Sequence, residues 1–365
     1  MGRVLTTASM LALGAGSALA GGVDRSGQSV GIIFEKGNYA EFSLGGVNPD
    51  VSGNALFPAL GTNSGDMSPG YGIVGAGYKH SFGNGLDAAI IFDQPYGADV
   101  SYPAAATYFA AGSTAVLDSN AITGVLKYKM PSNLSIYGGL RYQSLEATAV
   151  IPFVAGYVGT ASEDKSLGYL VGAAWEKPEI ALRVALTYNS KIKHDLDTVE
   201  NFVPGLTTST HVETPESVNL EFQSGIAKDT LLFGSVRWVH WTQFQIAPIG
   251  YVTAVGAPIV SYDSNATTWT LGVGRKFNES WSGAVTLGYE EPHDADGLSS
   301  NLGPTDGFWS IGVGGSYTQG PMKISAGLRY IDIGDTQTRV GALAPATSFR
   351  NNSGVAAGIK IGYTF

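Results

Sequence analysis

Most of the chain alternates apolar and polar side chains with a period of two residues. In the segment 323–330, Ile, Ala, Leu and Tyr alternate with Lys, Ser, Gly and Arg, and segments 135–142 and 182–189 repeat this arrangement. Strict alternation places the two sets on opposite faces of a β-strand. In a soluble β-sandwich the apolar side chains of such strands would face the interior. Here the polar set includes charged side chains in the middle of strand after strand. The pattern therefore predicts an all-β protein whose apolar faces point outward.

The connections between these strands are of two kinds. Short polar turns stand at 82–85, 130–133, 176–179, 227–230, 277–280 and 318–321. Longer stretches lie near 52–68, 101–113, 151–164, 190–211, 248–262, 291–306 and 335–350. Six turns and seven loops join fourteen strands, and short turns at one end with long loops at the other are typical of an outer-membrane barrel. We expect a 14-stranded antiparallel transmembrane β-barrel.

The two ends of the chain carry export features. Residues 1–20 contain Arg3, a short apolar stretch and a small-x-small site at Ala18–Ala20, which predicts a signal peptide and a mature start at Gly21. The last strand, 354–365, is apolar on one face and finishes on Phe365. It resembles the C-terminal strand by which outer-membrane barrels are handed to the barrel assembly machinery. We expect a multi-pass protein of the Gram-negative outer membrane.

Composition narrows the function classes. Charged residues are 14% and aromatic residues 11% of the chain, which excludes a disordered protein. The net charge of −9 argues against a nucleic-acid partner. The chain has no Cys, and beyond the signal no apolar run is long enough for a transmembrane helix. No HExxH, GxSxG or P-loop spacing is present, so we expect neither an enzyme nor a metal or cofactor.

A barrel of fourteen strands encloses a lumen that is either plugged or conducting. Residues 21–37 precede the barrel segment, 38–365, and carry an apolar cluster at Val30 and 32–34. An apolar cluster exposed to periplasmic water is unfavourable, so we interpret 21–37 as an N-terminal plug, or hatch, inside the lumen. An extension of the first strand or an ordered periplasmic tail is the alternative.

The third strand is interrupted. Residues 86–92 form one strand pattern, and Pro95 and Gly97 then interrupt the alternation before Val100. Pro95 removes a ladder donor and Gly97 relaxes the backbone, so pairing with a neighbour is expected to fail here. Unpaired backbone in a membrane is tolerated where it lines a cavity, so the segment Pro95, Tyr96 and Gly97 is a candidate lateral gap. The alternative is that the strand ends at Asp93 and a loop begins.

These features together resemble the FadL/TodX family of outer-membrane transporters for long-chain fatty acids and aromatic hydrocarbons. The local matches are 24–31 with 34–37, then 48–53, and 94–97 followed by Tyr102. The resemblance implies a barrel closed by a hatch, here including Gln28, Ser29, Val30, Ile32 and Phe34. It also implies a kinked third strand through which hydrophobic ligands leave sideways. The family's Asn-Pro-Ala hatch motif is absent between Gly21 and Tyr39.

Two groups of residues are candidates for ligand binding. Arg141, Arg183, Arg237 and Arg329 occupy the polar register of the fifth, seventh, ninth and thirteenth strands, where cations can hold a carboxylate. The alternative is that they pair with lumen acids such as Glu41, Glu221 and Glu290. The third and fourth loops carry apolar side chains, including Phe153, Tyr157 and Phe202. Such side chains suit the capture of a hydrophobic ligand. The alternative is that they pack the loops against each other.

The function expected from the sequence is passive uptake of long-chain fatty acids or similar hydrophobic molecules. Outer loops would capture the ligand, and the gap at the third strand would release it into outer-membrane lipid. Nothing in the chain indicates an energy source or requires more than a monomer. The alternative is a general diffusion porin for small hydrophilic solutes, which needs neither the apolar segment before the first strand nor the break at Pro95.

Overall fold

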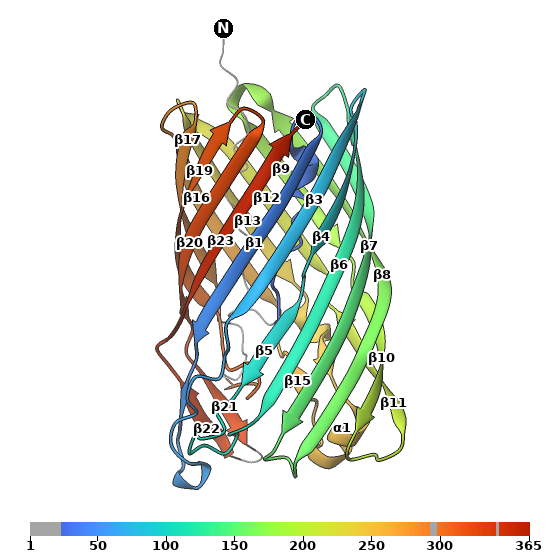
Figure 1. Ribbon diagram of the computed structural model, residues 1–365, viewed down its shortest axis with the longest axis vertical. Helices are drawn as coiled ribbons and strands as arrows, with labels where there is room; N and C mark the ends of the chain where they lie inside the picture. Colours follow the sequence, from blue (N-terminus) through green and yellow to red (C-terminus); the bar gives the residue numbers. More distant parts are fainter. Residues whose placement is uncertain (1–22, 293–297, 341–342) are drawn as a thin grey trace.

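The wall of the protein is a closed antiparallel β-sheet of fourteen strands (Figure 1). The computed structural model describes residues 23–292, 298–340 and 343–365. The expected signal peptide, 1–20, and the first two residues of the expected hatch lie outside the described residues. In order round the barrel the strands are β1 (Tyr39–Asp50), β3 (Tyr71–Gly83), β4 (Leu86–Asp93) continued by β5 (Gly97–Ser101), β6 (Thr114–Lys129), β7 (Leu134–Ile151), β8 (Tyr157–Lys177), β9 (Leu182–Asn189) continued by β10 (Ile192–Glu200), β11 (Thr207–Thr214) continued by β12 (Ser217–Ala227), β13 (Thr230–Val239), β16 (Ala266–Lys276), β17 (Trp281–Glu290), β19 (Phe308–Gln319), β20 (Met322–Ile333) and β23 (Asn352–Thr364).

The last strand closes the barrel on the first. β23 pairs with β20 on one side and with β1 on the other, in a register that runs from Tyr39 opposite Thr364 to Asp50 opposite Ser353. The terminal Phe365 extends this ladder, because its N–H donates to the carbonyl of Asn38 at 2.8 Å. Because β1 and β23 pair with each other, neither strand presents a free sheet edge.

The alternation seen in the sequence places apolar side chains on the outside. Leu140 on β7 is 64% exposed and Leu328 on β20 is 58% exposed, while Arg141, Gln143 and Arg237 are buried in the lumen. This arrangement reverses that of a soluble protein and confirms the predicted register. An outward apolar band around a polar interior is the surface that a bilayer covers.

The two ends of the barrel differ as expected. The six short turns join strands at one end, the end at which the chain terminates. The opposite end carries longer connections, with α1, β21 and β22 visible at the bottom of Figure 1. These connections contain β2 (Gly53–Ala55), η2 (Pro58–Leu60), η4 (Trp241–Gln243), β14 (Gln245–Ile246), α1 (Ile249–Val255), β15 (Val260–Ser261), β18 (Leu298–Ser299), β21 (Thr336–Val340) and β22 (Leu343–Phe349).

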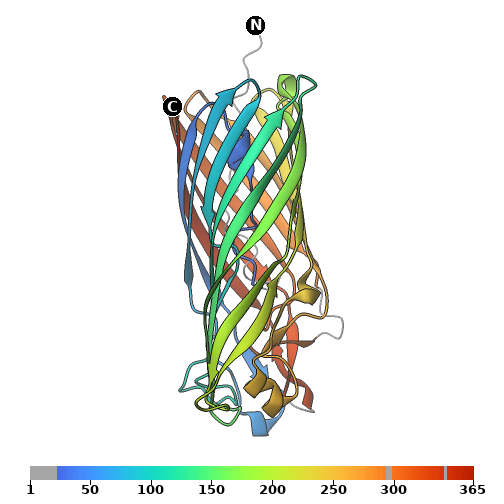
Figure 2. The same ribbon diagram turned by 90° about the vertical axis from the view of Figure 1, so that its right-hand side faces the viewer.

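Two of the seven expected long loops are wrong. The stretch 151–164 is a tight turn at 152–156 followed at once by β8, and 190–211 is the hairpin of β10 and β11. In β10, the charged Lys193 and Asp195 point outward, while His194 and Leu196 point inward and are buried. Alternation therefore continues beyond the apolar band, and on this side the wall extends further toward the long-connection end, at the bottom of Figure 2.

The hatch lies inside the lumen, near the short-turn end (Figure 2). Its 3-10 turn η1 (Gly31–Phe34) packs with Val30 into a buried cluster that includes Tyr137 of β7 and Leu170 of β8. The chain is therefore the plugged barrel predicted from the sequence. No helix within the described residues is long and apolar enough to cross a membrane.

Candidate functional site

An apolar cavity of about 130 Å³ lies between the hatch, the interrupted third strand and the long connections. The wall contributes residues of β5, β6 and β7, the hatch contributes Val23 and Arg25, and the connections contribute segments near 244–262 and 300–305. Most of these side chains are apolar, including Val100, Leu117 and Ala149. A concave apolar site with few polar groups is the usual form of a pocket for a small hydrophobic molecule.

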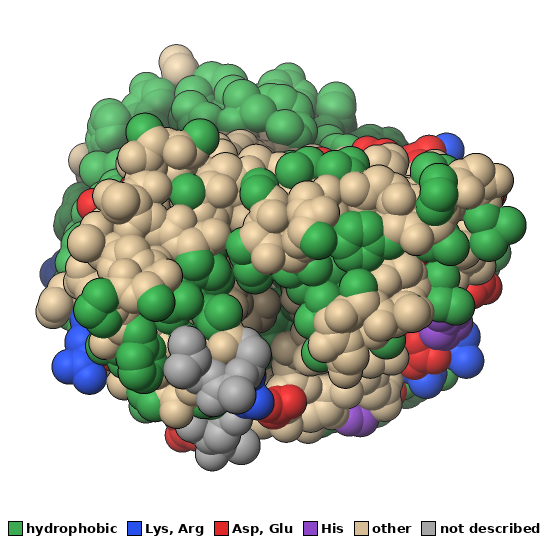
Figure 3. Space-filling view, turned by 90° about the horizontal axis from the view of Figure 1, so that it is seen from below, with side chains coloured by type: hydrophobic (Ala, Val, Ile, Leu, Met, Phe, Trp, Pro, Cys, Tyr) green, Lys and Arg blue, Asp and Glu red, His purple; other side chains and the backbone are tan. Residues whose placement is uncertain are grey.

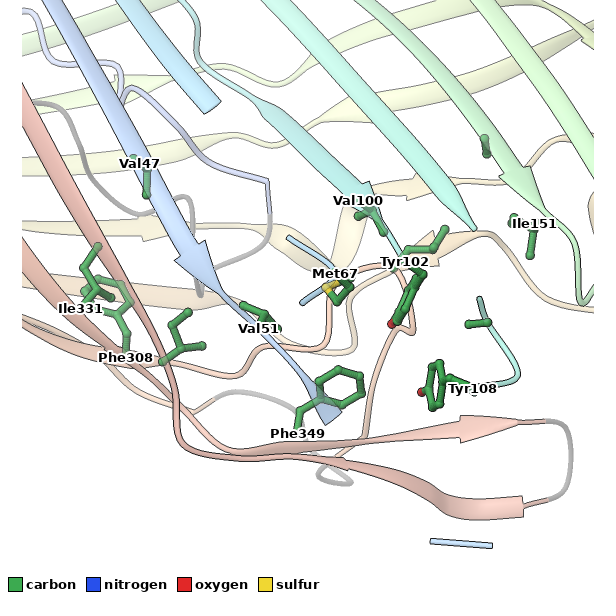
Figure 4. Packing of buried hydrophobic residues seen from close by; sticks show 14 of the residues in the cluster. Val47, Val51, Met67, Val100, Tyr102, Tyr108, Ile151, Phe308, Ile331 and Phe349 are labelled. Atoms are coloured by element: carbon green, nitrogen blue, oxygen red, sulfur yellow. The ribbon is translucent and has the colours of Figure 1, made fainter. Parts of the chain in front are cut away.

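A large buried cluster supports the cavity on the side of the long connections. Val51, Met67, Val100, Tyr102 and Ile151 belong to it, and Figure 4 shows Met67, Val100 and Tyr102 close together. Burial raises the pKa of Tyr108, a further member, to about 12, so this phenol stays neutral. Seen from outside, this end of the molecule bears scattered hydrophobic side chains, with charged groups gathered toward the rim (Figure 3).

The ladder of the wall is interrupted beside this cavity, in the segment that contains Pro95 and Gly97. β3 pairs with β4 only from Ala76 onward, and β5 pairs with β6 alone, so residues 71–75 of β3 have no strand partner on this side. The side chain of Gln94 compensates in part, because its Oε1 accepts a hydrogen bond from the Val74 N–H at 2.9 Å. The cavity lining includes Tyr71 of β3 and 97–100 of β5, one from each side of this gap.

The hatch satisfies the backbone of the break from inside. The Arg25 N–H donates to the carbonyl of Pro95, and the Gly97 N–H donates to the carbonyl of Val23, each at 2.8 Å. Tyr96, between them, is buried against Trp241 with ring centroids 5.9 Å apart. The first described hatch residues thus take the place of a neighbouring strand, which buried backbone groups require.

Arg25 spans the gap. Its Nη2 lies 2.5 Å from Oδ2 of Asp99 on β5, and its guanidinium lies 4.3 Å from the ring centroid of Tyr71 on β3. A Cβ built at Gly97 would lie 2.4 Å from Arg25 Cζ, so only glycine leaves room for this arrangement. Arg25 is not among the site residues predicted from the sequence, because its role depends on which wall strands the hatch meets. Its only signal was its place in the 24–31 match.

The four arginines predicted as ligand contacts face the lumen, but none of them lines the apolar cavity. Arg237 pairs with Asp24 of the hatch, Nε to Oδ2 at 2.6 Å, and Arg141 donates to Thr123 and Asn189. Arg183 lies over the ring of Phe34 at 4.7 Å. Arg329 lines a separate lumen cavity of about 30 Å³ between β17 and β23. The structure therefore places two of them, Arg183 and Arg237, against the hatch.

The predicted hatch residues make contacts of two kinds. Gln28 Oε1 accepts from the Ser217 hydroxyl and from Arg237, and the Ser29 hydroxyl donates to Glu221 at 2.8 Å. Val30, Ile32 and Phe34 are buried in the apolar cluster inside the barrel. The polar residues thus position the hatch and the apolar ones fill the lumen.

Two lysines hold the other end of the hatch. Lys79 Nζ donates to the carbonyls of Glu35 and Gly37, and Lys127 Nζ donates to the carbonyl of Ile33. Both lysines pair with the same carboxylate, Asp87, at 2.9 Å. Burial is the main cause that raises the pKa of the Glu35 side chain above its ordinary value of 4.5.

The three aromatic residues predicted at the loops lie near the cavity to different degrees. Tyr157 lines it, and its hydroxyl donates to Glu200 at 3.0 Å. Phe202 contacts the Tyr157 ring edge-on at 5.2 Å, and Phe153 contacts Phe109 at 5.0 Å. Phe202 packs against the buried cluster, Phe153 is 37% exposed, and neither lines the cavity. Among the described residues, no three acidic or His side chains lie together as a metal site requires.

The comparisons with known proteins agree on the fold. No protein-family model matches the sequence, and no curated protein matches it. Among solved structures, the chain is similar to a Pseudomonas aeruginosa FadL homologue, with 14% identity, 92% of each chain covered and a TM-score of 0.73. It is similar to the Pseudomonas putida toluene transporter TodX, with 11% identity, 95% of this chain and 96% of that chain covered, and a TM-score of 0.64.

A third structure, the Ralstonia pickettii toluene transporter TbuX, is 11% identical over 91% of this chain and 90% of its own, with a TM-score of 0.60. The chain therefore shares the fold of the FadL homologue and TodX structures over nearly its whole length. The expected resemblance is confirmed at the level of fold.

Proposed function

We propose that this chain is a passive outer-membrane transporter that takes up small hydrophobic molecules. The observation that carries the proposal is the apolar cavity whose lining includes both sides of the gap in the wall, Tyr71 on β3 and 97–100 on β5. The chain would reach the outer membrane through its signal peptide and the barrel assembly machinery, and would act as a monomer without chemistry of its own. The fold of the two toluene transporters supports this reading.

Uncharged ligands suit the cavity better than fatty-acid anions. Among the described residues Arg25 is the cation of the lining, and its charge is already matched by Asp99 at 2.5 Å, with Asp118 at 3.8 Å. A carboxylate that entered would meet a compensated arginine beside two acids, and would lose its hydration without gaining a partner. We therefore propose neutral aromatic or aliphatic compounds as the main ligands, with long-chain fatty acids as a second class.

The gap between β3 and β5 would release the ligand into outer-membrane lipid. An apolar molecule gains free energy by moving from a pocket into hydrocarbon without crossing water. Arg25 occupies this gap, and the hatch residues beside it fill the place of a strand, so release requires their displacement. Capture would begin at the long connections, where Phe153 and Leu206 are exposed.

The alternative of a general diffusion porin fits the lumen less well. The hatch is held by the Arg237–Asp24 pair at one end and by the two lysines at the other, and its apolar cluster fills the space between them. A porin needs an open aqueous path. Planar-bilayer conductance separates the two functions: we expect a silent intact protein that conducts when 21–37 are deleted, whereas large steps from the intact protein would establish the porin.

Uptake of toluene by proteoliposomes tests the cavity itself. Ala149→Trp places a large side chain in the cavity lining, and we expect uptake to fall to the level of empty liposomes. Ala173→Trp, on the outward face of β8, is the matched control and should transport normally. Circular dichroism verifies that both barrels are folded. Equal uptake by the two variants would refute the assignment of this cavity as the ligand site.

A further inference from the structure

The barrel wall has a second interruption, between β8 and β10. β8 pairs with β9 from Leu170 to Lys177, and with β10 only at 159–161. Between these two ladders, 162–169 of β8 and 190–197 of the facing chain have no strand pairing with each other. The two stretches are of equal length, and β8 carries a bulge within its stretch, where Leu145 pairs with Asp164 and Ala147 with Ala161 on the β7 side. We call 162–168 and 191–197 the β8–β10 seam.

Side chains close the seam in place of a backbone ladder. On the lumen side, His194 Nδ1 and Asp164 Oδ2 share a hydrogen bond at 2.9 Å. Nearer the short-turn end, Ile192 packs on the bare Cα of Gly168, where a built Cβ would lie 2.5 Å from Ile192 Cγ1. The Ser190 N–H then donates to the carbonyl of Tyr169 and restores the backbone contact. Opening the seam breaks the His194–Asp164 hydrogen bond and the Ile192–Gly168 contact, among the contacts between the two strands.

The seam borders the apolar cavity. Ala161 and Thr198 form the ladder pair next to it, and both line the cavity. Leu196, on the lumen side of the seam, belongs to a buried apolar cluster with Leu145, Trp241 and Phe244, and Phe244 also lines the cavity. A ligand that passed between β8 and β10 would pass the polar His194–Asp164 pair and would then meet the apolar side chains of this cluster on its way to the pocket.

The outer face of the seam is charged, unlike the apolar band below it. Glu163 and Lys165 point outward from β8, and Lys193 and Asp195 point outward from β10, all with exposed side chains. Leu167 and Tyr169, nearer the short-turn end, are exposed and apolar or aromatic. The seam therefore lies where the hydrocarbon ends and the polar head-group layer begins.

We propose that the β8–β10 seam is a side port that admits neutral hydrophobic molecules from the head-group layer directly into the cavity. This inference rests on the proposed uptake function and adds a route that bypasses the long connections. The port is closed by the His194–Asp164 pair and by Ile192, and it opens by separation of β10 from β8. Ligand would enter on this side and leave through the gap between β3 and β5.

A reversible cross-link tests the port, since the chain contains no native cysteine. In Gly168→Cys/Ile192→Cys the shortened side chain makes room for a disulfide across the seam. The control is Ala174→Cys/Ala185→Cys, a lumen-facing pair that is directly opposed in the β8–β9 ladder. We expect oxidation to lower toluene uptake by the seam pair and reduction to restore it, with no change in the control. A rate of uptake that oxidation of the seam pair leaves unchanged would overturn the proposal.

A labelling experiment addresses the seam without relying on transport. Leu196→Cys and Leu170→Cys are matched variants, since both leucines are 1% exposed and face the lumen, the first in the seam and the second in a ladder. A membrane-impermeant maleimide should modify Leu196→Cys and spare Leu170→Cys. Equal protection of both thiols would refute an opening seam, even if hydrophobic uptake is intact. Absence of uptake by the unmodified protein would instead refute the proposed function, and labelling would still decide whether the seam opens.

Discussion

The guanidinium of Arg25 rests on the Cα of Gly97, at a point where any larger residue would place its Cβ 2.4 Å from Arg25 Cζ. This contact brings a hatch side chain into the gap between β3 and β5, where it meets Asp99 and Tyr71. The break in the third strand and the hatch are therefore structurally coupled. The backbone of the hatch fills the break, and its arginine occupies the opening.

Substitution of Gly97 should weaken the contact between the hatch and the break. In Gly97→Ala the new methyl group displaces the guanidinium from Asp99, and we expect trypsin to cleave after Arg25 faster than in the unmodified protein. Gly124→Ala is the control, because a Cβ at that position on β6 meets nothing within 4 Å. Cleavage at equal rates in the two variants would contradict the close approach of Arg25.

Loss of the Arg237–Asp24 pair should release the hatch. Both side chains are buried, and removal of one partner of a buried pair costs about 3–5 kcal/mol because the other charge is left without compensation. We expect Arg237→Met to show frequent channel openings in planar bilayers, where the unmodified protein is silent. Arg350→Met, at an exposed arginine of the long-connection end, should remain silent.

Glu35 should make hatch docking depend on pH. Its pKa is raised in the docked hatch mainly by burial, with opposing attraction from Lys323, Lys360 and Arg183 and repulsion from Glu41. A carboxyl with a raised pKa favours the docked state when it is protonated, so docking weakens as pH rises from about 4.5 through the raised value. Bilayer openings should become more frequent over that interval. In Glu35→Gln this contribution to the slope should disappear, and an unchanged slope would exclude Glu35 as its source.

The helix α1 should depend on Glu200. The buried carboxylate of Glu200 accepts hydrogen bonds from the Gly250 and Tyr251 N–H groups, each at 2.8 Å, and from the Tyr157 hydroxyl. Glu200→Gln turns an amide donor toward these donors, and an unsatisfied buried donor costs about 1–3 kcal/mol. Hydrogen exchange of 249–255 should accelerate. The exposed Glu179→Gln, in the turn after β8, should leave the exchange unchanged.

The sequence by itself determined the features that depend on local order along the chain. Period-two alternation specified the strands and their outward face, short turns and loops specified the count of fourteen, and Pro95 with Gly97 specified the break. Each follows from the backbone geometry of a few consecutive residues, which is why these predictions were accurate. The hairpin of β10 and β11 was predicted as a loop, and its outward charges do not distinguish the two, because exposed polar side chains occur both in loops and in strands that extend beyond the membrane.

Only the tertiary structure decided which distant residues meet. Nothing local indicates that Arg25 reaches Asp99, that Arg237 binds Asp24, or that β8 and β10 separate around His194 and Asp164. Partners of this kind are set by the closure of the barrel and by the path of the hatch through it. These long-range contacts determine where the cavity lies, which residues line it and where its wall is interrupted. They do so because side chains far apart in the sequence pack together in one interior.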